Sequence, residues 1–106
     1  MAYSIVLLEY GQNLGSRLLG RSIIKELSTN LYNSDLIVLD FSNVRFMSVS
    51  FATEIFPSLV NDYQIKEIEI YNASDFIKRQ IDFTIKSMTK NESKFRFSTE
   101  RNKKGN

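Results

Sequence analysis

Hydroxyl and carboxyl side chains gather between Ile37 and Phe56, and they are the groups of this 106-residue chain that could do chemistry. The candidates among them are Asp40, Ser42, Ser48, Ser50 and Glu54. A serine nucleophile needs a base, and the chain contains no histidine that could supply one. The absence of cysteine excludes disulfides, thiol chemistry and thiolate metal sites. These absences argue against an enzyme, so we expect no catalytic residue, no metal and no cofactor.

Two of these side chains also have ordinary structural interpretations. Ser50 precedes an amphipathic segment and could be the N-cap of a helix, with Glu54 nearby. Asp40 closes an apolar run and could accept hydrogen bonds from the amides of its own loop. We favour both structural interpretations, although a helix cap and a phosphorylation site can be the same residue.

Three apolar runs alternate with three amphipathic segments along the chain. The runs at residues 3–8, 36–41 and 66–71 predict strands. Apolar residues at helical spacing predict helices that begin at Ser16 or Asn13, at Ser50 and after 72–75, and the first of these helices continues to Leu31. This order requires parallel strands joined by right-handed crossovers. We therefore expect a small, mainly parallel α/β sheet with amphipathic helices packed on it, which could all lie on one face.

Proline and phenylalanine residues give further expectations. Pro57 lies deep in the second helix and should kink or loosen it. Phe46 and Phe51 lie beside the loop that precedes this helix, and either would be an interface anchor if it is exposed. The segment from Phe95 to Phe97 could be a short edge strand.

Composition and charge indicate one globular domain followed by a basic tail. The chain is 42% hydrophobic and 25% charged, with a net charge of +2. Positive charge is concentrated after residue 89, so we expect a domain over residues 1–90 and a basic, flexible tail over 91–106. The first residues lack the basic region of a signal peptide, and no segment has the length of a membrane span. These features favour a cytoplasmic protein, most simply from a bacterium or a phage.

The stretch from Val38 to Ser50 resembles the STAS domain of bacterial anti-sigma factor antagonists. It resembles more closely the STAS-like domain of unknown function that is found in bacteria, often beside histidine-kinase-type ATPases. Asp40-Phe-Ser-Asn-Val44 is similar to the Asp-Leu-Ser-Gly-Val half of the STAS motif. Ser50-Phe-Ala-Thr-Glu54 is similar to Ser-Ser-Phe-Ala-Asp-Glu in STAS-like relatives, and Ile70-Tyr-Asn72 to the STAS strand that ends in Val-Asn. The resemblance covers residues 36–88.

The resemblance implies a non-catalytic regulatory subunit that binds a histidine-kinase-type ATPase. The phosphorylated serine of the antagonists falls on Ser50, with Ser48 as the second candidate. Ser48 stands where the antagonists have an acid, and Phe51 stands where they have a glycine. The partner-binding residues expected on this basis are Asp40, Ser42, Arg45, Phe46, Phe51 and Glu54.

A nucleic-acid-binding accessory protein is the alternative function. Its candidate contacts in the tail are Lys94, Arg96, Arg101, Lys103 and Lys104. Phe95 and Phe97 could stack on bases, and Arg17 and Arg21 could add charge from the first helix. A solvated tail and a solvated helix face are the simpler interpretations of these residues.

Overall fold

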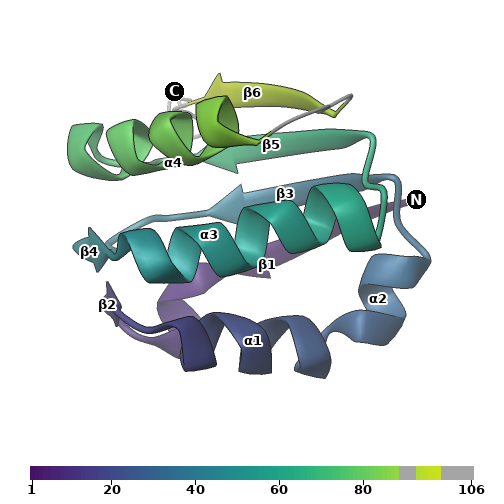
Figure 1. Ribbon diagram of the computed structural model, residues 1–106, viewed down its shortest axis with the longest axis horizontal. Helices are drawn as coiled ribbons and strands as arrows, with labels where there is room; N and C mark the ends of the chain where they lie inside the picture. Colours follow the sequence, from purple (N-terminus) through teal and green to yellow (C-terminus); the bar gives the residue numbers. More distant parts are fainter. Residues whose placement is uncertain (89–92, 99–106) are drawn as a thin grey trace, which may run out of the picture.

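The computed structural model, which describes residues 1–88 and 93–98, contains a four-stranded parallel sheet (Figure 1). Its strands, in spatial order, are β1 (Ala2–Val6), β3 (Leu36–Asp40), β5 (Glu67–Tyr71) and β6 (Lys94–Ser98). A second, two-stranded parallel pair joins β2 (Asn13–Leu14) to β4 (Phe46–Met47) beyond the end of the main sheet. The expected parallel α/β fold is therefore confirmed.

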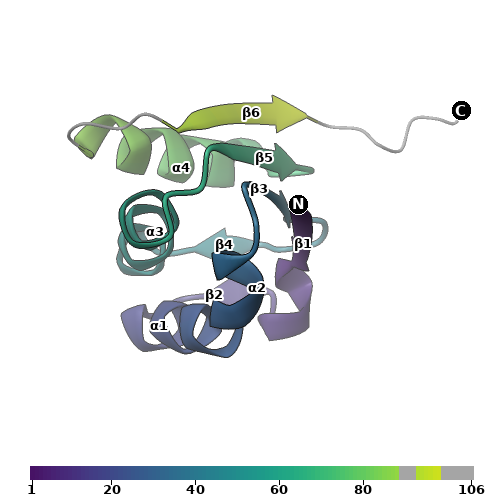
Figure 2. The ribbon, with the colours of Figure 1, turned by 90° about the vertical axis from the view of Figure 1, so that its right-hand side faces the viewer.

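The long helices cover one face of this sheet. They are α1 (Arg17–Glu26), α3 (Val49–Pro57) and α4 (Asp75–Ser87), accompanied by a short helix α2 (Ser28–Tyr32), a 3-10 helix η1 (Leu7–Tyr10) and a π-helix η2 (Ser58–Asp62). Figure 2 shows all three long helices on the same side of the strands. Helix α3 lies between α1 and α4 and packs against both. No described helix combines the length and the apolar character needed to cross a membrane.

The core lies between the helices and the inner face of the sheet. Alternate strand residues are buried, such as Ile37 and Leu39 in β3 and Ile68 and Ile70 in β5. They meet the apolar stripes of the helices, which include the buried Phe56, Ile77 and Ile81. The intervening strand residues, such as Val38 and Glu69, are half-buried on the opposite face, which no described helix covers. The sheet is thus packed on one face, as period-two alternation requires.

Several predicted element boundaries hold and others shift. Ser16 is the N-cap of α1, since its Oγ accepts a hydrogen bond from Leu19 N at 3.1 Å. The first strand is shorter than predicted and ends at Val6. The helix expected to reach Leu31 is divided at Leu27 into α1 and α2, where the poor helix formers of residues 28–30 follow. At Pro57, α3 gives way to the π-helix η2, as the missing amide donor of proline predicts.

Strand β6 lies inside the segment that we expected to be a flexible tail. Lys94 to Ser98 pair in parallel with β5, which confirms the edge strand but places these residues in the sheet. A domain boundary at residue 90 would therefore cut through the fold. The remaining tail, residues 99–106, lies outside the described residues.

Candidate functional site

Asp40 connects the ends of two strands to the loop that precedes α3. Its Oδ1 accepts hydrogen bonds from Ser42 N at 2.9 Å, from Ser42 Oγ at 2.7 Å and from Asn72 Nδ2 at 3.1 Å. Asn72, with φ of 61°, is the first residue after β5. Asp40 therefore bonds an amide of its own loop, as predicted, and also holds the end of β3 to the end of β5. This geometry gives Asp40 and Ser42 a structural role in holding the loop that precedes α3.

The loop between β3 and α3 is held by main-chain hydrogen bonds. Gln12 O accepts from the amides of Arg45 and Phe46, and Leu14 O accepts from Ser48 N at 2.9 Å. On the other side, Gln80 Nε2 of α4 donates to Met47 O at 2.9 Å. The loop is thus anchored to two separate segments and presents its side chains from a fixed backbone.

Ser48, not Ser50, is the N-cap of α3. Ser48 has extended backbone angles, and its Oγ accepts a hydrogen bond from Phe51 N at 3.0 Å. The helix therefore begins at Val49, earlier than predicted, and Ser50 is its second residue. The side chain of Ser50 is exposed, whereas that of Ser48 is half-buried and engaged in the cap.

Phe51 and Phe46 have opposite environments. Phe51 is only 1% exposed and belongs to the core, so the expectation that it contacts a partner is wrong. Its ring lies one helical turn before Ile55, on the same buried stripe of α3. Phe46 is 41% exposed and stacks on Phe76 of α4, which is itself 39% exposed, with the ring centroids 5.7 Å apart.

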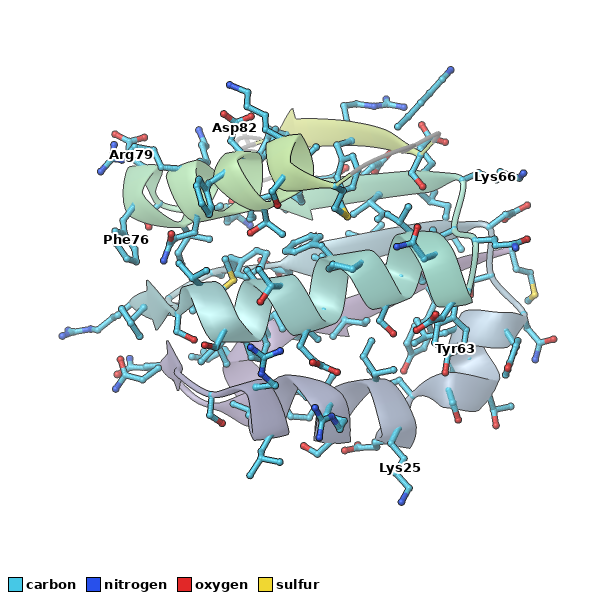
Figure 3. The ribbon with its side chains drawn as sticks, viewed as in Figure 1. Lys25, Tyr63, Lys66, Phe76, Arg79 and Asp82 are labelled. Carbon is cyan, nitrogen blue, oxygen red and sulfur yellow. The ribbon has the colours of Figure 1, made fainter. Side chains whose placement is uncertain are left out.

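Phe46, Val49 and Ser50 are exposed within five residues of one another at the start of α3, and Phe76 joins them through its stack on Phe46. We call the side chains of Phe46, Val49, Ser50 and Phe76 the α3 surface. Val49 is 44% exposed beside Ser50, and Phe76 projects from the first turn of α4, at the same end as Arg79 (Figure 3). Sequence reasoning missed Phe76 as a site residue. The available signal was its position beside the apolar stripe of α4, where a large apolar residue has no core to enter.

Glu54 faces α1 and forms ion pairs there. Its carboxylate lies 3.7 Å from Arg17 and 3.4 Å from Arg21, and the Glu54 side chain is 23% exposed. The two helices approach closely at Gly20. A Cβ added there would lie only 3.2 Å from the Cβ of Glu54. The three charged residues therefore connect α1 to α3.

The predicted nucleic-acid contacts are only partly described. Arg96 pairs with Glu67 and, at 3.8 Å, with Glu69 on the neighbouring strand. Lys94 is exposed on β6. The other candidates, Arg101, Lys103 and Lys104, lie outside the described residues. Arg45, expected to contact a partner, is exposed in the loop before β4.

Three described groups have pKa values displaced from their ordinary range. Burial and the nearby Glu26 raise the pKa of Tyr10, and burial raises the pKa of Tyr63. The amino group of Met1 lowers the pKa of Asp35 by a hydrogen bond and by its charge. These groups lie away from the α3 surface. Among the described residues, no cluster of three or more histidine, cysteine or acidic side chains could hold a metal ion.

The fold and the loop define a class: a small α/β domain whose parallel sheet carries helices on one face and an Asp-centred loop before α3. A family described as a STAS-like domain of unknown function matches residues 20–78. The chain belongs to this family, as the resemblance predicted. The matched residues run from α1 into α4 and include the whole loop. Comparisons with curated proteins and with solved structures found no match.

Proposed function

We propose that this domain is a non-catalytic regulatory module that binds a protein partner through the α3 surface. The observation that carries the proposal is the stacked, exposed pair of Phe46 and Phe76. Large aromatic side chains that are half exposed and held in place are typical anchors of protein interfaces. The anchored loop keeps Phe46 in position before binding, which reduces the entropy lost on association.

Membership in a STAS-like family supports the regulatory role and suggests the partner. The resemblance to STAS domains implies that a histidine-kinase-type ATPase docks on the loop and on the start of the following helix. Those segments correspond here to residues 41–48 and to α3. We propose an ATPase of this type as the partner. The structural roles of Asp40 and Glu54 fit a binding module, because both carboxylates are engaged in holding the fold.

Ser50 is the proposed switch of this surface. It is exposed at the second position of α3, where a phosphate would meet free backbone amides and the positive end of the helix dipole. The phosphate would also place charge and bulk beside Val49 in the apolar patch. Ser48 is the weaker candidate, because its Oγ already accepts the capping hydrogen bond from Phe51 N.

Replacing both Phe46 and Phe76 with alanine should abolish capture of the partner while leaving the fold intact. Wild-type and variant domains would be immobilised and incubated with lysate of the source organism, and the captured proteins identified by mass spectrometry. We expect the wild-type domain to capture a histidine-kinase-type ATPase. The Kd of this ATPase for the purified double variant should be about 30-fold or more above its Kd for the wild type, as for a hot spot. Phe83→Ala is the matched control, since Phe83 is an exposed phenylalanine elsewhere on α4. An equal loss of binding in Phe83→Ala would overturn the proposal. Capture of nucleic acid, and of no protein, by the immobilised wild-type domain would overturn it as well.

Ser50→Glu should weaken binding of the same ATPase by about tenfold, because a carboxylate enters the apolar patch. Ser50→Ala should bind as the wild type does, since Ser50 does not cap the helix. Incubation of the domain with the ATPase and ATP, followed by peptide mass spectrometry, tests the modification directly. Phosphate on Ser48 and none on Ser50 would contradict the assignment.

A further inference from the structure

The edge strand β6 directs the main-chain groups of alternate residues away from the sheet. Lys94 N donates to Lys66 O at 2.8 Å, so the amide of Lys94 points toward β5. By the alternation of a parallel ladder, the amides and carbonyls of Phe95 and Phe97 point away from β5. Among the described residues, β6 pairs with β5 alone (Figure 1). This edge therefore offers donors and acceptors to a further strand.

A hollow of about 260 Å³ lies beside this edge, on the helix side of the sheet. Lys78, Arg79 and Asp82 of α4 and Phe97 of β6 line it, and Phe97 is 39% exposed. Figure 3 shows Arg79 and Asp82 on the side of α4 that faces away from α3. A strand added to β6 would place every second side chain on the helix side, next to the hollow, because side chains alternate across a strand.

The hollow carries an excess of positive charge. Lys78 is half-buried and Arg79 is exposed, and neither has an ion-pair partner among the described side chains. Asp82 is the acidic residue of the lining, but its carboxylate pairs with Lys86 at 3.0 Å. The two cations of α4 are therefore available to the carboxylates of a ligand.

The opposite face of β6 is also basic. Lys94 is exposed there, next to Arg96, which pairs with Glu67 of the neighbouring strand. Charged side chains on an edge commonly prevent unwanted pairing with other strands. The same charges become favourable when the added strand carries the opposite charge.

We infer that the β6 edge and the hollow bind an extended, acidic segment of a protein partner, which adds a strand to the sheet. The main chain of this segment would bond the amides and carbonyls of Phe95 and Phe97, and its carboxylates on the helix side would meet Lys78 and Arg79. The edge presents donors and acceptors in alternation, which a peptide strand matches. The backbone of single-stranded DNA offers acceptors without donors, so the edge favours a peptide.

A model peptide of about eight residues, alternating glutamate with threonine, tests the inference. Fluorescence anisotropy of the labelled peptide with the full wild-type chain should give a Kd of about 100 µM. The same peptide with glutamine in place of glutamate should bind about tenfold more weakly, because it cannot form charge-assisted hydrogen bonds with the cations. Lys78→Gln combined with Arg79→Gln should raise the Kd of the glutamate peptide by about the same factor.

Lys25→Gln combined with Lys66→Gln is the matched control. It removes the same charge at two exposed positions that lie away from Arg79 and Asp82 (Figure 3). This variant should bind the glutamate peptide with a Kd within about twofold of the wild type, since charges at that distance are screened by salt. Thermal unfolding shows whether both double variants are folded. An equal loss of affinity in the control would overturn the inference.

N-methylated peptides test the main-chain pairing on the unaltered chain. Only alternate residues of an added strand direct their amides to the edge. Methylation of one set, the glutamates or the threonines, should therefore abolish binding, whereas methylation of the other set should leave it intact. Equal affinities for the two methylated peptides would contradict strand addition. No binding at about 1 mM, or tighter binding of an oligothymidine of the same length, would overturn the inference as well. The site uses no residue of the α3 surface, so the result does not depend on the proposed function.

Discussion

Replacing Phe51 with alanine lowers the free energy of unfolding by about 3–5 kcal/mol, the cost of removing a buried ring and leaving a cavity. Phe51 is 1% exposed and lies in the core cluster together with Ala52, Ile55 and Phe56. The loss is large for a small domain, whose total stability is about 5–15 kcal/mol. Urea unfolding followed by circular dichroism measures it.

Phe46→Ala is the matched control for this prediction. The same chemical change at a ring that is 41% exposed should cost less than about 1 kcal/mol. If Phe51→Ala does not fold, Phe51→Leu still tests the burial, because this smaller change should cost about 1–2 kcal/mol. Equal costs at Phe46 and Phe51 would contradict the assignment of one ring to the surface and the other to the core.

The contrast between the two rings shows what the sequence could and could not predict. The stripe of α3 includes Ile55 and Phe56, and extending it back by one turn would have included Phe51. A separate ambiguity concerns the cap of α3, since Ser48 and Ser50 are equally good caps by residue type. Only the backbone conformation at Ser48 distinguishes them, and that conformation depends on contacts with distant segments, such as Leu14.

The strands were predictable because their signal is local. Alternation of Ile68 and Ile70 with glutamates marks β5, and the apolar run before Asp40 marks β3. The contacts that shape the site join distant positions instead. The stack of Phe46 on Phe76 and the ion pairs of Glu54 with α1 have no local pattern in the sequence.

Asp40→Ala should lower the free energy of unfolding by about 2–4 kcal/mol, because it leaves several hydrogen-bond donors without their acceptor. The donors are Ser42 N, Ser42 Oγ and Asn72 Nδ2, all in a half-buried region. Asp40→Asn should cost less, about 1–2 kcal/mol, since an amide oxygen still accepts but without the negative charge. Urea unfolding of both variants measures the difference.

Asp82→Ala is the control for the loss of a carboxylate. Asp82 is exposed and pairs with Lys86 one helical turn away, at 3.0 Å, so its removal should cost about 0.5 kcal/mol or less. A cost at Asp40 no larger than at Asp82 would show that the network does not stabilise the fold.

A double-mutant cycle decides whether Asp40 stabilises the domain by joining β3 to β5. Asn72→Gly removes the donor amide and tolerates the φ of 61° that this position requires. If the bond from Asn72 to Asp40 joins the strand ends, the two substitutions together should cost less than the sum of their separate costs, by about 0.5–1.5 kcal/mol. Additive costs would show that the bond from Asn72 to Asp40 does not account for the stabilisation. Coupling would instead mean that the loop before α3 takes its position from two strands of the sheet, so that the α3 surface inherits its rigidity from the core.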